Sequence, residues 1–283
     1  MRPQHTIRRA VSVAGAGYWT GRPVTVEFVP APAGTGIVFV RAGAGVPVRI
    51  PAAVDHRVEA TARTNLASAG VRVEMVEHAL AALAALGVDC CVVRVDADEL
   101  PGLDGSSLAY VEALDFAGLE SLGAPLEPLV VQGVHRVGDD SSWVEVCPPR
   151  FAGLSVDYEL DYGPGPIGRQ TFAVRVTPDA FRRELAAART FITTDEADRL
   201  RAAGLARHVG YGDLLVFGPD GPLDNALRWP DECVRHKVLD LVGDLALVGR
   251  PLHAHVRACR SGHRLNGAVA ARLVASAGRR ASA

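Results

Sequence analysis

The sequence has no C-x-x-C pair, and its five cysteines cannot all form disulfides with one another. The missing pairs exclude the common cysteine-based zinc sites, so a metal would need nitrogen and oxygen ligands. The cysteines lie in apolar stretches, and we expect reduced thiols in a cytoplasmic protein. They are Cys90, Cys91, Cys147, Cys233 and Cys259.

Several other features are also missing. No run of about 18 apolar residues occurs, so we expect no membrane span. The 30 basic and 32 acidic residues leave a net charge of -2, so we expect no nucleic-acid partner. Arg8 and Arg9 are not followed by the sustained hydrophobic region of an export signal. G-x-S-x-G, H-E-x-x-H and phosphate-loop motifs are absent, and GAGYWTG lacks the spacing of a dinucleotide site.

The chain is long enough for two domains, since it has 283 residues, of which 48% are hydrophobic and 22% charged. Residues 121–128, SLGAPLEP, have the small residues and prolines of a linker. Strands and helices follow a similar plan on both sides of it. We therefore predict an α+β fold of two tandem domains, 1–122 and 128–283. Each would layer a β-sheet with α-helices, and the active-site cleft would lie between them.

Hydrophobic periodicity locates the main elements. Helical spacing begins at Val73 and ends before Gly87, and further helices are predicted at 107–119, 178–188, 231–248 and 265–276. Strands are predicted within 6–50 and at 88–96, 129–137, 142–148, 154–162 and 252–259.

The segment DECVRHKVLDLVGDL carries polar residues at helical spacing. His236, Asp240 and Asp244 follow one another at steps of four and share one helix face. A histidine and an aspartate one turn apart can bind the same cation. This spacing alone is more common on a solvated helix face, so other ligands are needed to support a metal site.

Glu77 and His78 supply that support at the start of an otherwise apolar helix. Adjacent helical residues differ by about 100°, so both side chains can approach one cleft. With His236 and Asp240 they form three ligands and a free carboxylate, the composition of an open catalytic zinc site. His263 follows a glycine turn at the head of a helix, where its side chain can also reach a cleft.

Two other patterns favour structural roles. His253 and His255 lie on the same side of a predicted strand, but no partner ligands are evident nearby, so we interpret them as ordinary strand residues. Asp104 in GLDGSS is interpreted as a turn residue.

At these residues the chain resembles the UDP-3-O-acyl-N-acetylglucosamine deacetylase (LpxC) family, which performs the committed step of lipid A biosynthesis. The resemblance extends through almost the whole chain. Its motifs are TGRPVTVEFVPAPAGTGIVFVR, VEHALAALAALGVD, ELPGLDGSS, ARTF, LRWPDECVRHKVLDLVGDL and SGHRLN.

The resemblance implies a zinc ion held by His78, His236 and Asp240. It implies that Glu77 is the general base that deprotonates the attacking water. His263 would be the protonated partner that stabilises the oxyanion and donates a proton to the leaving amine.

Three further residues receive catalytic roles from the resemblance. Asp244 would orient the His263 imidazole, Lys237 would add positive charge, and Thr190 would hydrogen-bond the tetrahedral intermediate. The implied substrate is a UDP-linked acylated amino sugar, and we expect a monomer.

The resemblance also implies substrate contacts. An insert from Phe191 to Pro222 would form an apolar passage for the acyl chain, with a wall from Leu200, Leu205, Leu214, Leu215 and Val216. Asp161 and Tyr162 match the place where an aromatic packs on uracil. Arg260 would supply a cation for the diphosphate.

The chain departs from the family pattern at Tyr18 and Trp19, where Leu-His is usual, at Met75, where Thr is common, and at Cys233. None belongs to the inferred metal set.

A paralogue acting on another N-acetyl amino sugar is one alternative. A mononuclear iron oxygenase shares the ligand types but usually needs a jelly-roll sheet, and a non-catalytic binding protein would not require the full set of catalytic residues.

Overall fold

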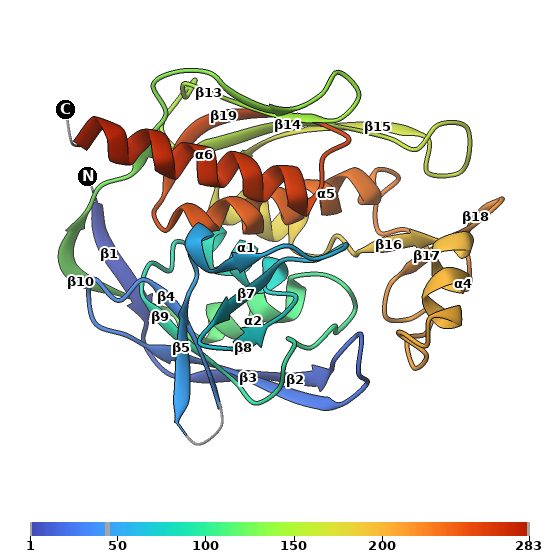
Figure 1. Cartoon of the computed structure of the whole chain (residues 1–283), viewed down its shortest axis with the longest axis horizontal. Helices are drawn as coiled ribbons and strands as arrows, with labels where there is room; N and C mark the ends of the chain where they lie inside the picture. Colours follow the sequence, from blue (N-terminus) through green and yellow to red (C-terminus); the bar gives the residue numbers. More distant parts are fainter. Residues whose placement is uncertain (1, 43–45, 282–283) are drawn as a thin grey trace.

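The computed structural model describes residues 2–42 and 46–281. The chain forms four layers, with a β-sheet on each outer side and helices between them (Figure 1). The first sheet has the strand order β2-β3-β9-β4-β5. Its strands are β2 (Val11–Ala16), β3 (Pro23–Pro30), β9 (Cys91–Val95), β4 (Ile37–Ala42) and β5 (Pro47–Pro51).

Two helices belong to the first half of the chain, α1 (Glu77–Leu86) and α2 (Leu108–Ala117). Gly87 ends α1 in a left-handed conformation, with φ of 78°, which glycine adopts without a Cβ penalty. The predicted helix and its terminator are therefore confirmed. A smaller sheet lies beside them, with β6 (Arg57–Val58), β7 (Asn65–Ser68) and β8 (Val71–Val73) after the short helix η1 (Val54–His56).

The second main sheet has the order β12-β13-β19-β14-β15, and β11 (Leu129–Val130) pairs with β19. Its strands are β12 (His135–Gly138), β13 (Trp143–Cys147), β19 (Leu252–Cys259), β14 (Leu154–Asp161) and β15 (Arg169–Val176). In β14, Val156, Tyr158 and Leu160 are buried and alternate with half-buried polar residues. The helices α5 (Glu232–Leu245), continued by η3 (Ala246–Val248), and α6 (His263–Ala281) cover this sheet (Figure 1).

Residues 191–222 form a small unit that projects from the side of the four layers (Figure 1). It contains β16 (Phe191–Thr193), α4 (Thr194–Ala202), β17 (Leu215–Gly218) and β18 (Gly221–Pro222). Thr193 and Glu196 begin α4 with a capping box. Among the described residues, no helix has both the length and the apolar composition needed to cross a membrane.

The α+β class is confirmed, but the structure differs from three local predictions. Residues 121–128 are not a linker, because most of them belong to β10 (Leu119–Leu126), which pairs antiparallel with β1 (Arg2–Ile7). The predicted strand 129–137 is divided into β11 and β12. The predicted helix 178–188 is reduced to α3 (Pro178–Ala180) and a π-helical turn, η2 (Phe181–Leu185).

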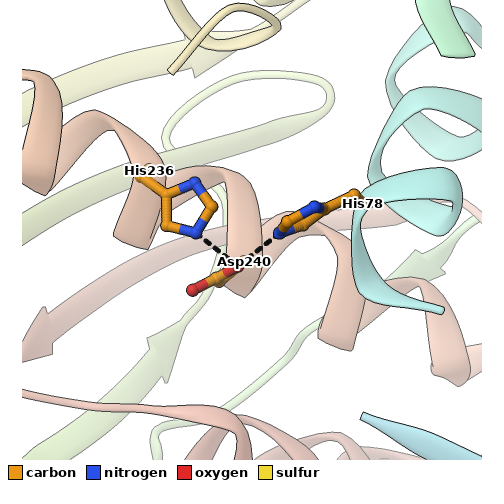
Figure 2. Close-up of side chains that lie close together, drawn as sticks. All are labelled: His78, His236 and Asp240. Carbon is orange, nitrogen blue, oxygen red and sulfur yellow. Dashed lines mark ion pairs between the residues drawn. The ribbon is translucent and has the colours of Figure 1, made fainter. Parts of the chain in front are cut away.

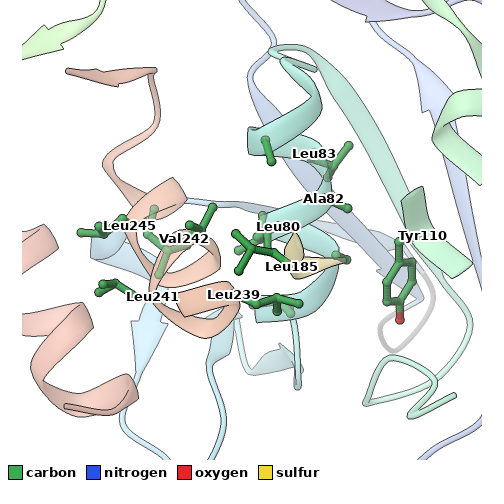
Figure 3. Close-up of a cluster of buried hydrophobic side chains, with 14 of the residues drawn as sticks. Leu80, Ala82, Leu83, Tyr110, Leu185, Leu239, Leu241, Val242 and Leu245 are labelled. Carbon is green, nitrogen blue, oxygen red and sulfur yellow. The ribbon is translucent and has the colours of Figure 1, made fainter. Parts of the chain in front are cut away.

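The helices α1 and α5 join the two halves through a shared hydrophobic core. Leu80 and Leu83 of α1 belong to the same buried cluster as Leu239 and Val242 of α5 (Figure 3). The backbones approach closely, because a Cβ at Gly243 would overlap the carbonyl of Glu77. This packing brings the start of α1 beside α5, where the polar residues lie.

Candidate active site

His78, His236 and Asp240 face one another across the α1–α5 contact (Figure 2). Asp240 Oδ1 lies 3.5 Å from His78 Nε2 and 3.3 Å from His236 Nε2. Ligand atoms about 2.0–2.1 Å from a tetrahedral zinc ion lie about 3.3–3.4 Å from one another. Both distances from Asp240 Oδ1 therefore suit a tetrahedral metal site, and the three side chains form a possible metal-binding group.

The protonation of His236 suits a metal ligand. Its Nδ1 donates to the Ala188 carbonyl at 3.0 Å, which leaves the Nε2 lone pair facing Asp240. Burial lowers the pKa of His236 to about 3, although Asp240 opposes the shift. The imidazole is therefore neutral near pH 7 and has its free lone pair at the site.

Asp240 presents an unsatisfied oxygen to the same point. Its Oδ1 is buried and has no hydrogen-bond partner among the described residues, while its Oδ2 accepts from Lys237 Nζ at 2.9 Å. Burial opposes the charge, but His236, Lys237 and His263 together hold the pKa of Asp240 well below its usual range. A buried carboxylate oxygen without a partner is costly, and a bound cation would remove that cost.

Glu77 is buried beside the metal-binding group and lines the same cavity. Its Oε2 accepts from the backbone N–H of Thr64 at 3.0 Å. Burial raises the pKa of Glu77, and His263 and His78 partly oppose that shift. A carboxylate with a raised pKa is a better general base because it holds a transferred proton more readily.

His263 is held at the head of α6 by a buried polar cluster. Its Nδ1 donates to Asp244 Oδ2 at 2.9 Å, and Asn266 Nδ2 donates to the same oxygen at 2.8 Å. Thr64 Oγ1 donates to Asp244 Oδ1. Burial disfavours the charged imidazole, but Asp244, Asp240 and Glu77 outweigh it and raise the pKa of His263 to about 9. The ring is therefore a proton donor near pH 7.

The sequence interpretation missed Thr64 and Asn266. Asn266 follows His263 by three residues in SGHRLN, so helical spacing could have identified it. Thr64 lies in a loop segment, and no local pattern indicates that its backbone would hold Glu77 while its hydroxyl binds Asp244.

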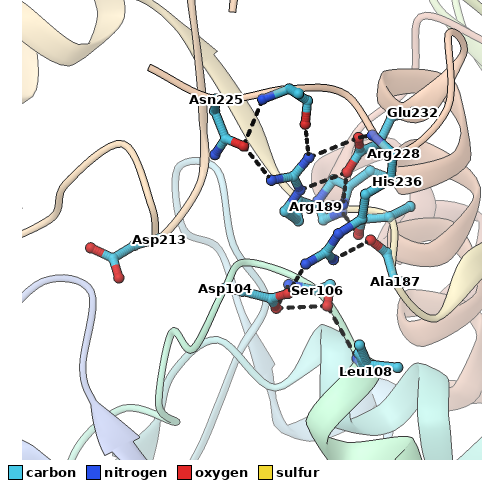
Figure 4. A network of polar contacts seen from close by, with 12 residues as sticks. Asp104, Ser106, Leu108, Ala187, Arg189, Asp213, Asn225, Arg228, Glu232 and His236 are labelled. Carbon is cyan, nitrogen blue, oxygen red and sulfur yellow. Dashed lines mark hydrogen bonds and ion pairs between the residues drawn. The ribbon is translucent and has the colours of Figure 1, made fainter. Parts of the chain in front are cut away.

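A second buried network supports the site from the base of the projecting unit (Figure 4). Arg189 Nε donates to Glu232 Oε1 at 2.8 Å, and its other nitrogens donate to Asn225 Oδ1 and the Ala226 carbonyl. Arg189 directly follows Ala188, whose carbonyl orients His236. The sequence interpretation missed this Arg189–Glu232 pair.

Asp104 links the same region to the first half of the chain. It accepts from the Ser106 N–H at 3.0 Å, which confirms the predicted turn, and from Arg228 Nη2 at 2.8 Å.

A cavity of about 790 Å³ opens over the metal-binding group. Thr190, Phe191 and Lys237 line it, with Lys237 Nζ 5.4 Å from the centre of the Phe191 ring. Burial opposes the Lys237 charge, but Asp240 outweighs it and keeps the pKa of Lys237 above its ordinary value. Tyr162 also lines the cavity, 5.5 Å from Phe191 between ring centres.

Residues of the projecting unit form an apolar part of the cavity wall. The predicted wall residues that line it are Leu200, Leu205, Leu214 and Val216. Leu215 lies in the main hydrophobic core and is fully buried, so the structure does not bring its side chain to the cavity.

Two predicted substrate residues lie outside the described cavity lining. Asp161 accepts from the Gly163 N–H at 2.8 Å and closes a turn. Arg260 is exposed, and its carbonyl accepts from Ser142 Oγ at 2.8 Å. Of the residues that depart from the family pattern, Tyr18, Trp19 and Met75 line the cavity, and Cys233 is buried in the core.

Sequence comparisons show extensive similarity. Residues 4–275 match the family described as UDP-3-O-acyl N-acetylglycosamine deacetylase (LpxC). The protein of this name from Solibacter usitatus is 38% identical over 97% of this chain and 92% of its own length. Those from Anaeromyxobacter dehalogenans and Brucella ovis are 39% and 40% identical, over 96% and 93% of this chain and 87% and 92% of their own lengths.

Proposed function

The chain belongs to the UDP-3-O-acyl N-acetylglycosamine deacetylase family, and we propose that it hydrolyses the N-acetyl group of UDP-3-O-acyl-N-acetylglucosamine and releases acetate. This is the committed step of lipid A biosynthesis. The observation that carries the proposal is the group of His78, His236 and Asp240 beneath a cavity that Glu77 and His263 also line. A metal-dependent amide hydrolase requires these groups together.

We propose zinc as the metal because two imidazoles and one carboxylate, at the observed spacing, match an open catalytic zinc site. When bound, the ion would polarise the acetyl carbonyl and lower the pKa of the attacking water. The unpartnered Asp240 Oδ1 and the neutral His236 support this fit.

The protein side chains divide the proton transfers in this proposal. Glu77, held by the Thr64 N–H, accepts the proton of the attacking water. His263, oriented by Asp244, stabilises the oxyanion and donates its Nε2 proton to the leaving amine. Lys237 and Thr190 line the cavity where they can contact the reacting group.

The cavity also has regions suited to the rest of the substrate. The apolar wall that includes Leu200 and Leu214 is proposed to bind the 3-O-acyl chain, and Phe191 lines the same cavity with its ring centre 6.4 Å from that of His236. Tyr162 is the proposed aromatic contact for uracil. Arg260 is the proposed cation for the diphosphate, and Asp161 accompanies Tyr162 at the proposed uracil contact; both residues lie outside the described cavity lining.

Because one chain supplies every group of this site, the proposed enzyme works as a monomer. A cytoplasmic location belongs to the same proposal, since all five cysteines are free thiols.

A second candidate is deacetylation of a different N-acetyl amino sugar. Trp19 and Met75, which depart from the family pattern, both line the cavity. The two candidates differ in the sugar or acyl group that fits the cavity and share the amide chemistry.

Acetate release from UDP-3-O-acyl-N-acetylglucosamine tests the proposal directly. The zinc-loaded protein should release acetate, and Asp240→Ala should lose both the metal and the activity. Glu77→Gln should keep the metal while its rate falls about 100- to 10,000-fold, because only the base is lost. Asp140→Ala, at an exposed position, is the matched control.

Metal content must be measured for each variant. The absence of acetate release by the zinc-loaded parent would refute the proposed reaction. Release from a different N-acetyl amino sugar alone would favour the second candidate.

A further inference from the structure

The projecting unit, 191–222, is joined to the first half of the chain through side-chain contacts of Tyr18 and His208. Tyr18 Oη donates to the carbonyl of Asp213. In the opposite direction, His208 Nε2 donates to the carbonyl of Gly17 at 2.8 Å. Two side chains, one from each segment, therefore bind the backbone of the other segment.

The side chains of Tyr18 and His208 pack closely against three glycines of the first half of the chain. Tyr18 is buried and its ring lies against the turn at 102–105. A Cβ at Gly102 would lie 2.7 Å from that ring, and one at Gly105 would lie 2.8 Å from its hydroxyl. A Cβ at Gly21 would similarly lie 2.7 Å from the His208 ring. These distances are shorter than ordinary van der Waals contacts, so glycine is required at each place.

The segment that Tyr18 binds is also fixed from its other side. Asp213 Oδ2 accepts from the Gly210 N–H at 2.8 Å and closes a tight turn. Within this turn the Tyr211 carbonyl accepts from Asn225 Nδ2 at 2.7 Å. Asn225 Oδ1 in turn accepts from the buried Arg189 (Figure 4). The turn therefore cannot shift freely while both attachments hold.

One partner of these attachments, Tyr18, belongs to the cavity wall itself. Tyr18 packs in one hydrophobic cluster with Ala197, Leu214 and Val216 of the projecting unit, and Trp19 packs against that cluster. All five residues line the cavity. Adjoining parts of the cavity wall thus come from the first half of the chain and from the projecting unit, and the contact between these parts fixes their relative position.

We propose that Tyr18 and His208 form a latch, a pair of hydrogen bonds that holds these two parts of the cavity wall together. By fixing the wall, the latch selects the acyl chains that bind. Both act as positioning residues through the Asp213 and Gly17 carbonyls. The inference rests on the deacetylase function proposed above. It adds a determinant of acyl-chain selectivity in the first half of the chain.

The test uses the zinc-loaded, full-length protein with Tyr18→Phe, His208→Ala and the double variant. Tyr211→Phe is the matched control, because its hydroxyl has no hydrogen-bond partner among the described residues and Tyr211 lies outside the cavity lining. Amide hydrogen exchange of peptides covering 205–214 reports the latch without requiring activity. Each single variant should exchange about fivefold faster there, as expected for the loss of one hydrogen bond.

Kinetics then report selectivity. The substrates are UDP-3-O-acyl-N-acetylglucosamine with a long saturated chain and its analogue with a 3-O-acetyl group. Each single variant should raise KM for the long-chain substrate about fivefold, leaving kcat and the KM for the short analogue unchanged. General structural damage would instead lower kcat and metal content with both substrates.

The results separate the two proposals. Exchange and KM values equal to those of the parent in the double variant would refute the latch, and so would a KM increase of equal size with both substrates. If the parent released no acetate from either substrate, the deacetylase function would fail. The exchange data alone would then decide whether Tyr18 and His208 hold the projecting unit.

Discussion

The His263–Asp244 pair should control the alkaline side of the pH profile. In the proposed reaction His263 must be protonated to donate to the leaving amine, and Asp244 with its neighbours raises the pKa of His263 to about 9. The kcat/KM of the parent should therefore be retained at neutral pH and fall as pH rises through about 9. Asp244→Asn removes the nearest negative charge, so the falling limb should move to lower pH.

Steady-state kinetics across the alkaline range check this prediction. His263→Ala should remove that limb at a much lower rate while zinc content persists, because His263 is not a metal ligand in the proposed site. A falling limb that stayed unchanged in His263→Ala would assign the ionisation to another group, such as Lys237.

The sequence predicted where a side chain points when residue spacing within one helix determines that direction. It predicted this poorly elsewhere. His236 and Asp240 are one helical turn apart, so their shared face follows from α5 alone. Leu215 was expected in the acyl passage, but successive side chains of extended backbone point to opposite sides. Leu214 and Val216 therefore line the cavity while Leu215 enters the core.

The α1–α5 contact is the element on which the site depends. Gly243 of α5 meets the Glu77 carbonyl so closely that a Cβ would overlap it. Gly243→Ala should force the two helices apart, and we expect a loss of about 1–3 kcal/mol in the free energy of unfolding. Zinc affinity should fall with it, because His78 is on one helix and Asp240 is on the other.

Gly278→Ala in α6 is the matched control, since among the described residues a Cβ there would meet no atom within 4 Å outside its own stretch of helix. Chemical denaturation and zinc titration of both variants measure the two effects. Equal stability and zinc affinity in Gly243→Ala and the parent would show that the helix contact tolerates the added methyl group.

Elements were predictable where their own residues determine them. The helix α1 has an apolar repeat and a glycine terminator, and both are local signals. The strand β10 has no apolar repeat and no glycine terminator, and its small residues and proline are typical of a linker. It becomes a strand only by pairing with β1 at the other end of the first half. The turn at 181–185 likewise departs from a helix of ordinary hydrogen-bond spacing, which periodicity does not distinguish.

For the whole molecule, the sequence indicated two similar halves but not how closely they join. We retain 1–122 and 128–283 as a proposed division, with the site at its boundary. One hydrophobic cluster extends through both halves, from Leu80 in α1 to Val242 in α5 and beyond. The pairing of β1 with β10 and the contacts of Tyr18 and His208 add further links that local composition does not reveal.

The metal should therefore stabilise the molecule as a whole, because its proposed ligands join the two halves. His78 lies in the first half, and His236 and Asp240 lie in the second. Binding to the folded state alone would contribute about 2.7 kcal/mol when free zinc is 100 times its Kd. For a chain of this size that corresponds to a rise in Tm of roughly 4–6 °C over the chelated protein.

Calorimetry of the zinc-loaded and chelator-treated parent measures this shift, and adding zinc back should restore the higher Tm. Asp240→Ala provides the control, with each preparation compared only with its own chelated form. The Tm of this variant should not respond to zinc, since the Asp240 carboxylate is missing and alanine cannot bind a cation. An equal zinc response in Asp240→Ala and the parent would place the stabilising ion elsewhere, whereas a response confined to the parent supports a metal that bridges α1 and α5.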